Sequence, residues 1–481
     1  MTHRAYYGRF GLSTALIAWL ASIPAMAGQW HATPELEVAE TYTDNVDLNA
    51  TGTGRKTDFI TRISPGVQVT GKSGRTTLDL TYRLNYLIFA RSDEDTDLRH
   101  FLDARGHSEL IEDFFFLDLG GSVNQQFLDR GGAISGNQDN ATDNRRTVQN
   151  YNISPYIRRP LGTLATATAR YRLSYVDVSG PASNNPLLDV LSETVSHQGV
   201  VQLDSGPSFT RLGWSLSGSY TRDDRTQGRR DSERAIGRAE LRYTVSQWLT
   251  LLGSVGYEDI TDTSLLNDRD GVTWDAGFTL KPGPRTVLTV RGGERYNEMN
   301  WSAVLNYKIS NRTRVRAGYT EEITTTLRIL QDELSGGEPG GPVVDPGGFS
   351  LVDSAFKRNR VYGGVNGSRG RTTFSLDGFY EERRFDIATT PPENRYGGHG
   401  VISRRLSPRL TANIGGNYEK TEIKGLAARE DDFYGAHAGL NYSFSQYISG
   451  GVTYYFTSRE SDEASRDLKE NAVKINIRAT F

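Results

Sequence analysis

The chain has 481 residues, a formal net charge of −3 and no cysteine, so disulfides and thiolate metal sites are excluded. No basic stripe typical of a nucleic-acid-binding protein is present. The mean hydropathy of −0.52 excludes helical membrane crossing beyond the N-terminus, because each crossing helix needs about 20 apolar residues. A membrane β-barrel is still allowed, since its strands need an apolar residue only at every second position.

The first 27 residues have the three parts of a secretory signal peptide. Arg4 and Arg9 precede a short apolar run, Phe10–Ile23, and the A-x-A site Ala25-Met26-Ala27 follows. This order predicts export and cleavage after Ala27. The alternative, an uncleaved membrane anchor, is disfavoured because the apolar run is short. We therefore expect a signal peptide over residues 1–27 and a mature chain over 28–481.

From Trp30 onward, apolar and polar residues alternate in long runs. In Thr77–Ala90, the apolar residues Leu78, Leu80, Tyr82, Leu84, Tyr86 and Ile88 share one face. Period two indicates a strand, and runs of about 10–14 residues suit a tilted membrane-crossing strand better than a strand of a soluble sheet. The same pattern recurs in Thr210–Arg222, Thr373–Glu382 and Tyr434–Phe444.

The connections between these runs favour a barrel over a soluble sandwich. Short turns and longer polar loops are expected to alternate strictly, as in outer-membrane barrels. The fold class predicted is all-β: a transmembrane antiparallel up-and-down barrel of about 22 strands, within a range of about 18–24, with both termini in the periplasm. The weakest runs are Trp30–Thr43, Phe101–Ile111 and Val148–Ile157.

The final run adds a separate indication of the outer membrane. Apolar residues alternate up to a C-terminal aromatic, at Val473, Ile475, Ile477, Ala479 and Phe481. This pattern is similar to the C-terminal signal that the barrel-assembly machinery reads. The expected location is the outer membrane of a Gram-negative bacterium, with that machinery, membrane lipid and lipopolysaccharide as partners.

Charged residues at the polar positions of the runs are expected to line the lumen. They are Arg170, Arg172, Arg234, Arg238, Glu240, Arg242, Arg314, Arg316, Asp377, Glu381, Lys474 and Arg478. Such charges either set the solute preference of a pore or pair across strands and hold the wall together. The sequence leaves both interpretations open.

No catalytic, cofactor-binding or metal-binding residues are predicted. The seven histidines share no metal-ligand spacing, and the acidic groups at 93–97 and 267–271 lack the full spacing of a calcium loop. No G-x-S-x-G motif occurs. A Ser-His-acid set on a barrel wall, as in a barrel hydrolase, is left open by the sequence.

The lumen is expected to have no plug domain, because the first strand should begin by about Pro34, soon after the cleavage site. It is then open, filled by inward side chains or closed by a loop. The longest segment without strand character is 325–354, rich in Pro and Gly and on the outer side by parity. A segment of this length is usually functional or disordered, so it is interpreted either as a constriction or lid or as a floppy surface loop.

The start of the mature chain resembles a known family. The residues concerned are Trp30-x3-Pro34-x-Leu36-x-Val38-x-Glu40-x-Tyr42-Thr43-Asp44-Asn45, followed by Ile63-Ser64-Pro65-Gly66. They are similar to the opening of the PEP-CTERM system-associated outer-membrane β-barrels, found with exosortase and exopolysaccharide loci. The resemblance implies a non-enzymatic channel or scaffold in exopolysaccharide export, with polysaccharide-export components as partners. A general diffusion porin and a barrel hydrolase are the alternatives.

Overall fold

The computed structural model describes residues 28–51, 54–92, 96–128, 132–180, 193–226, 231–262, 269–295, 298–326, 328–329, 355–385, 391–425 and 428–481. The expected signal peptide, 1–27, and most of the long segment 325–354 lie outside the described residues. Within the described part, no helix is long and apolar enough to cross a membrane.

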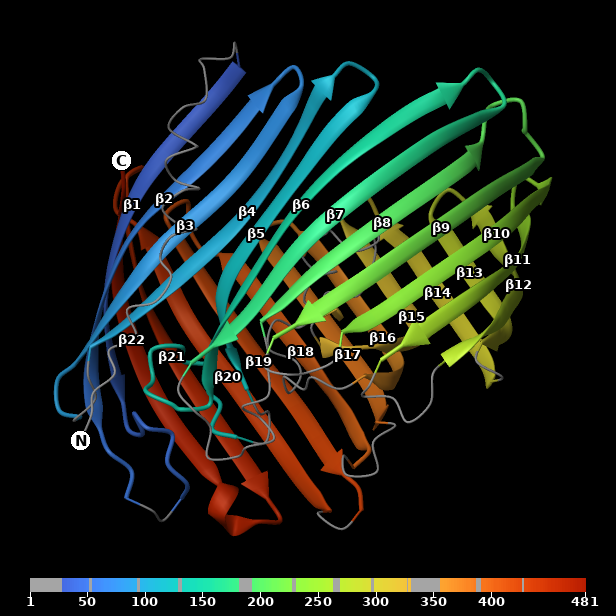
Figure 1. Cartoon of the computed structure of the whole chain (residues 1–481). Coiled ribbons are helices and arrows are strands. Elements are labelled where there is room, and N and C mark those ends of the chain that lie inside the picture. Colours follow the sequence, from blue (N-terminus) through green and yellow to red (C-terminus); the bar gives the residue numbers. More distant parts are fainter. Residues whose placement is uncertain are drawn as a thin grey trace.

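A single 22-stranded antiparallel sheet makes up the fold (Figure 1). The strands are β1 (Gly28–Thr43), β2 (Asp58–Ser73), β3 (Thr76–Phe89), β4 (Asp97–Ile111), β5 (Phe115–Phe127), β6 (Arg145–Leu161), β7 (Ala165–Ser179), β8 (Thr194–Ser205), β9 (Leu212–Arg225), β10 (Ser232–Ser246), β11 (Leu249–Thr261), β12 (Arg269–Gly283), β13 (Thr286–Arg295), β14 (Glu298–Ser310), β15 (Thr313–Thr324), β16 (Phe356–Arg369), β17 (Thr372–Phe385), β18 (Glu393–Arg405), β19 (Leu410–Ile423), β20 (Arg429–Ser443), β21 (Ile448–Ser461) and β22 (Leu468–Thr480). A 3-10 turn, η1 (Ala464–Arg466), precedes β22.

The sheet closes on itself because the first and last strands pair. Their register runs from Glu35 opposite Thr480 to Thr43 opposite Ala472. Closure removes the exposed edges that an open sheet would present. The expected count of about 22 strands is confirmed, and the three weakest runs are all strands. β1 begins at Gly28, in agreement with a first strand that was expected to start by about Pro34.

One end of the barrel carries short turns and the other carries mostly longer connections. In Figure 1 the short turns lie along the upper edge and the longer connections along the lower edge. The expectation of strict alternation was wrong at one place. β13 ends at Arg295 and β14 begins at Glu298, so only two residues connect them on the long-loop end. Two residues are enough to join antiparallel strands.

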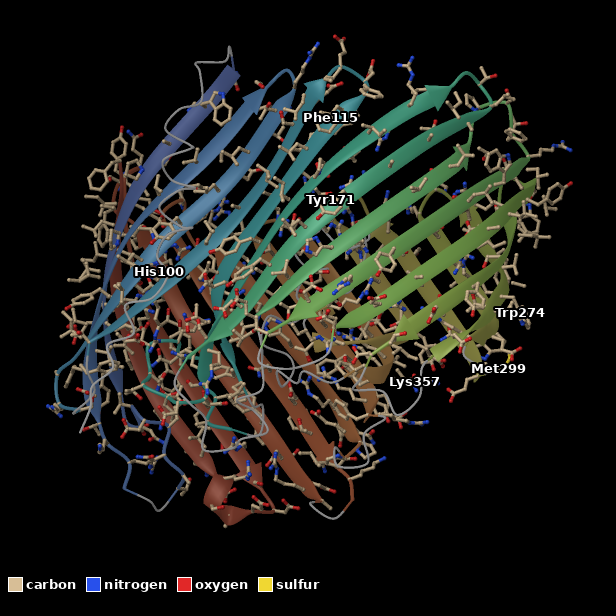
Figure 2. The ribbon with its side chains drawn as sticks, viewed as in Figure 1. His100, Phe115, Tyr171, Trp274, Met299 and Lys357 are labelled. Atoms are coloured by element: carbon tan, nitrogen blue, oxygen red, sulfur yellow. The ribbon has the colours of Figure 1, made fainter. Side chains whose placement is uncertain are left out.

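The two faces of the wall differ in polarity, as the alternation requires. Apolar side chains point outward: Ile402 and Ile475 are each 55% exposed, and Trp274 and Met299 project from the outside of the wall in Figure 2. Charged and polar side chains turn inward and many are buried there. An apolar outside and a polar inside are what a membrane barrel needs.

Glycine makes room for large rings on the wall. A Cβ at Gly71 would overlap the Trp30 indole, and a Cβ at Gly415 would overlap the His437 imidazole. Both glycines lie on the strand next to the ring and in register with it. A larger residue at either position would force the ring to move.

Candidate pore constriction and lumen wall

The connection between β5 and β6, described from residue 132 to residue 144 and here called the inner loop, folds into the barrel. Its polar side chains Asn137, Asp139 and Asn140 are at most 1% exposed, although connections normally lie at a protein surface. Hydrogen bonds link these residues to β1 and β22, which lie several strands away around the ring. Figure 1 shows this teal segment in front of the red strands. The inner loop therefore occupies space inside the end of the barrel that carries the longer connections. We call this the outer end, because the long loops of outer-membrane barrels face outward.

Asp139 is the central anchor of the inner loop. Its carboxylate lies 2.9 Å from the Lys474 ammonium and 2.8 Å from the Arg62 guanidinium, and it accepts a 2.9 Å hydrogen bond from the Thr41 hydroxyl. Burial opposes ionisation, but the charges of Lys474 and Arg62 outweigh it and lower the pKa of Asp139 to about 2. Asp139 is thus an anion held by cations from two different strands.

The ion pairs continue along the inner wall below Asp139. Arg62 also pairs with Glu37 of β1, and Glu37 accepts hydrogen bonds of 2.9 and 2.5 Å from Arg478. Acids and bases therefore alternate through Lys474, Asp139, Arg62, Glu37 and Arg478, and the arrangement offsets the cost of burying each charge. We call these five residues the clasp.

A second buried carboxylate, Glu470 of β22, holds the inner loop from its other side. It accepts hydrogen bonds from Thr43 at 2.8 Å, from Asn140 at 2.7 Å and from Ser135. Arg99 and Arg145 donate to the backbone carbonyl oxygen of Gln138, each at 2.5 Å. These two arginines, from β4 and β6, thus bind the backbone of the inner loop to the wall.

Apolar side chains from opposite sides of the ring also meet at this end. Leu128 and Val148, from the β5–β6 side, form one buried cluster with Ile329 and Phe356, from the β15–β16 side. β6 and β16 lie on opposite sides of the strand order, so this cluster bridges the lumen. We call these four residues the septum. Each is at most 7% exposed.

Next to the septum, four arginines surround one buried glutamate on β16–β18. Glu381 lies 2.9 Å from Arg358 and 2.6 Å from Arg383, and Arg360 is 3.5 Å away. Arg395 lies 2.6 Å from Glu419 of β19. These groups are nearly fully buried, so removing the shared carboxylate would leave buried cations without their partner.

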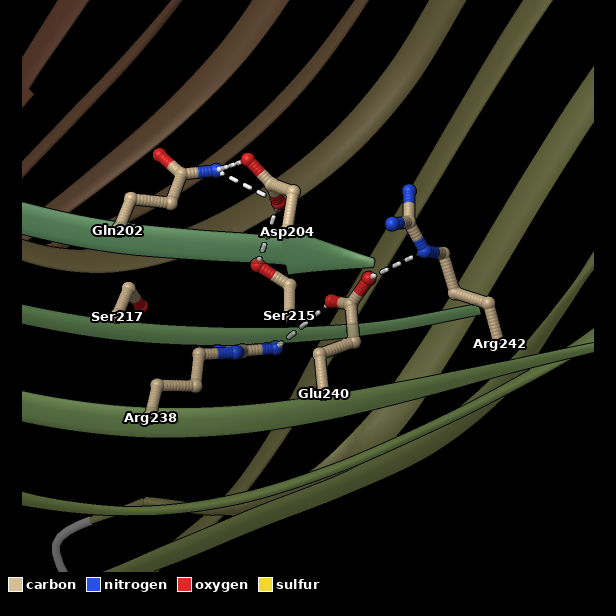
Figure 3. A pocket seen from close by; sticks show the side chains of 7 residues that line it. All are labelled: Gln202, Asp204, Ser215, Ser217, Arg238, Glu240 and Arg242. Atoms are coloured by element: carbon tan, nitrogen blue, oxygen red, sulfur yellow. Dashed lines mark hydrogen bonds and ion pairs between the residues drawn. The ribbon is translucent and has the colours of Figure 1, made fainter. Parts of the chain in front are cut away.

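A small polar cavity of about 220 Å³ lies on the inner wall of β8–β10 (Figure 3). Asp204 accepts hydrogen bonds from Gln202 at 2.9 and 3.0 Å and from Ser215 at 2.8 Å. Glu240 lies between Arg238, at 3.9 Å, and Arg242, at 3.7 Å. This part of the wall is a network of paired charges near the short-turn end.

The structure places most of the predicted lumen charges in ion pairs or hydrogen bonds. The pairs are Arg170 with Asp118 at 2.7 Å, Arg234 with Glu258 at 3.8 Å, Arg238 with Asp275 at 2.5 Å, Glu240 with Arg291 at 2.8 Å, Lys474 with Asp139 and Arg478 with Glu37. Arg172 follows the inward alternation of β7. Asp377 accepts a 2.7 Å hydrogen bond from Ser375. Within the described part of the chain, Arg314 and Arg316 form no ion pair.

Sequence reasoning missed the residues that anchor the inner loop. Asp139 lies in one of the longer polar connections, and Glu37 and Arg62 are absent from the predicted lumen charges. Period two places Glu37 and Arg62 on the inner face of their strands and could have found them. No local pattern could have shown that Asp139 docks against a residue more than 300 positions away.

Histidines and acids of the described residues were the candidates for a metal or catalytic site. No group of three or more His, Asp or Glu side chains there is placed to hold a metal ion. His107 lies 2.7 Å from Asp118, but in the described part of the chain no serine hydroxyl bonds to His107, and Arg170 shares the same aspartate. The chemistry of the lumen is that of charge pairing.

The last five strands match a known porin family model. Residues 397–481 match the model described as "Putative beta-barrel porin 2". No curated protein sequence matches the chain. The match covers the closing segment of the barrel, from β18 to β22. This closing segment is thus similar to a porin β-barrel family.

Solved structures agree with this fold. The apoprotein form of the FrpB iron transporter from Neisseria meningitidis superposes with a TM-score of 0.55 at 10% identity, over 93% of this chain and 81% of that one. The siderophore receptor PirA from Acinetobacter baumannii gives a TM-score of 0.52 at 9% identity, over 95% and 81%. At such low identity the likeness concerns the fold alone.

Proposed function

We propose that this chain is a non-enzymatic outer-membrane channel for exopolysaccharide export, linked to a PEP-CTERM and exosortase system. The observation that carries the proposal is the inner loop, held inside the outer end of a closed 22-strand barrel by the clasp. A purely structural wall would not need a buried loop anchored by charge. The family resemblance of Trp30–Asn45 supplies the choice of cargo. Export by the signal peptide 1–27, a lumen without a plug domain and assembly through Phe481 belong to the same proposal.

The geometry suits a channel that rests closed. The inner loop and the septum together occupy the outer end, one held by ion pairs and the other by apolar contact. A passing polymer can displace either only by exchanging these contacts for its own. Such a barrier keeps small solutes from leaking while no polymer is present.

The direct test is deletion of the gene in the producing bacterium, with surface polysaccharide as the measurement. The proposal expects secreted polysaccharide to fall, and to return when the wild-type gene is supplied. A complementing copy with Asp143→Asn, an exposed acid of the inner loop, should restore secretion fully. Unchanged secretion in the deletion strain would count heavily against the proposal.

A general diffusion porin for small solutes is the second candidate, favoured by the family-model match at 397–481. Planar-bilayer conductance separates the two. A stable open conductance that does not change when residues 325–354 are deleted favours the porin, because a porin rests open. A barrel hydrolase is a weaker third candidate, and hydrolysis of lipid or polysaccharide by the purified chain would revive it.

A further inference from the structure

The two ends of the lumen differ in how their charges are arranged. At the outer end, most inward cations pair with buried acids, as in the clasp and around Glu381. At the short-turn end, six exposed cations on the lumen side form no ion pair with any other described residue. They are Arg158, Arg211, Lys281, Lys308, Arg314 and Arg405, and we call them the mouth cations.

Five of the mouth cations lie on the lumen side of their strands, and Arg211 directly precedes the outward Leu212 of β9. Arg158 stacks over the inward rings of Phe116 and Tyr156, at 5.7 and 5.8 Å. Lys308 follows Tyr307, which is 40% exposed on the outside, and Arg405 precedes the outward Leu406, which is 46% exposed. Because successive side chains of a strand point to opposite faces, Lys308 and Arg405 point inward.

The mouth cations are spread around more than half of the ring, from β6 to β18. Among the described residues, the inward acids nearest this end of the same arc are Asp204, Glu240 and Asp377. Asp204 accepts a hydrogen bond from Ser215, Glu240 pairs with Arg291, and Asp377 accepts a hydrogen bond from Ser375. Cations without an ion pair thus outnumber these acids at this end. Unpaired charges of one sign on a concave wall attract ligands of the opposite sign. The field reaches only about 8 Å at physiological salt, so a small anion would meet one or two of these cations at a time. A polymer could meet several together and gain from multivalency.

We propose that the short-turn mouth of the barrel is a receiving site for an acidic polysaccharide, one whose sugar units carry carboxylate groups. This inference rests on the proposed export function and adds the chemical class of the cargo. Exposed contacts of this kind are individually weak, and a channel needs binding weak enough for the polymer to leave. Short turns face the periplasm in outer-membrane barrels, so the site lies on the side from which cargo would arrive.

The test uses the full mature chain in lipid nanodiscs and titration calorimetry with three probes: oligogalacturonate, neutral maltodextrin of equal length and inorganic phosphate. Oligogalacturonate should bind, more weakly as salt is raised, whereas the other two should bind at least about tenfold more weakly. Equal affinity for maltodextrin would overturn the charge argument, and equal affinity for phosphate would overturn the polymer argument. Absence of oligogalacturonate binding would overturn both.

Matched variants locate the site. The triple variant Lys281→Gln, Lys308→Gln, Arg314→Gln should weaken oligogalacturonate binding by at least about tenfold. The control, Arg159→Gln, Arg369→Gln, Arg404→Gln, removes equal charge from exposed residues of the outer face at the same end and should change affinity less than about twofold. Equal losses in both would overturn the proposal. Arg158→Gln, Arg211→Gln, Arg405→Gln replaces the first triple if that variant does not fold.

Failure here and failure of the export function give different results. Deletion of the gene could reduce surface polysaccharide while the variant Lys281→Gln, Lys308→Gln, Arg314→Gln binds oligogalacturonate like the wild type. That result would support the export function and contradict the receiving site for an acidic polysaccharide. Oligogalacturonate could instead bind through the mouth cations while deletion of the gene leaves secretion unchanged. That result would support the binding site and contradict its role in exopolysaccharide export.

Discussion

The carboxylate of Asp139 lies 2.9 Å from the ammonium of Lys474. This contact joins the loop after the fifth strand to the strand that closes the barrel. Lys474 also lies between Val473 and Ile475 of the proposed assembly signal. The same strand thus carries an apolar outward face and an inward cation that holds the inner loop. Closure of the barrel and closure of the lumen are therefore linked through one strand.

Replacing Asp139 should release the inner loop. Asp139→Asn leaves Arg62 and Lys474 buried with one anion fewer, and breaking a buried pair typically costs about 3–5 kcal/mol. We expect the single-channel conductance in planar bilayers to rise while the barrel stays folded. Asp143→Asn, in the same loop but exposed, is the control and should behave as wild type. A D139N conductance equal to that of the control would contradict the anchoring role.

Docking of the inner loop should weaken in acid. Asp139 has its pKa lowered from 3.8 to about 2, so the undocked loop binds protons more readily than the docked one. The ionised Asp139 therefore stabilises the docked loop by on the order of 2 kcal/mol above pH about 4. This stabilisation is lost as the pH falls through about 2. Because the chain has no cysteine, a fluorophore on Asp143→Cys can report the release. The acid transition should be absent when Asp139→Asn is added, and its persistence there would point to another group.

Shortening a septum side chain should loosen the cross-lumen contact. Phe356 is 1% exposed, and truncating a buried Phe to Ala typically costs about 3–5 kcal/mol. Phe356→Ala is expected to raise the frequency of channel opening. Leu376→Ala, on the outer face and 60% exposed, should leave gating unchanged. If both variants gate alike, the septum is not a barrier.

The arginine group around Glu381 should depend on its carboxylate. Glu381→Gln removes the anion shared by Arg358, Arg360 and Arg383, so the folded barrel should lose about 3–5 kcal/mol. The loss is measured by electrophoresis of samples heated to increasing temperatures. The temperature at which the folded band converts to the unfolded band should be lower for the variant. Asp377→Asn, whose carboxylate accepts a hydrogen bond from the Ser375 hydroxyl, is the matched control. An equal shift for both variants would argue against a special role of Glu381.

The C-terminal aromatic should matter for assembly rather than for stability. Phe481 is 73% exposed and follows the last strand, so Phe481→Ala removes little packing from the folded barrel. We expect less folded barrel in the outer membrane of cells, measured by the heat-modified mobility of membrane fractions. Phe444→Ala, another exposed aromatic at the same end, is the control. Normal levels of F481A would contradict the assembly signal.

The barrel itself could be read from the sequence because its physical cause is local. Alternation in runs such as Thr77–Ala90 reports which side chains face lipid, and that pattern fixed both strand type and approximate number. The lengths of the connections are harder to predict, because they do not follow from alternation within a strand. The two-residue connection after Arg295 departs from the expected alternation of short turns and longer loops. The inward face of Lys474 and Arg478 also followed from alternation alone.

What fills the lumen could not be read in the same way. The contact between Asp139 and Lys474, and that between Leu128 and the β15–β16 side, join residues far apart in the chain. Such contacts depend on the curvature of the closed wall, which brings side chains together without leaving a sequence period. The sequence drew attention to 325–354, whereas the described closure rests largely on the shorter inner loop.

The central claim, a barrel closed at rest by its inner loop, is tested most directly by planar-bilayer conductance of the mature chain and of its Asp139→Asn, Phe356→Ala double variant. The wild type should show little stable conductance, and the double variant should show large, long-lived open steps. A wild-type chain with a wide, stable conductance that the double variant does not change would contradict the account.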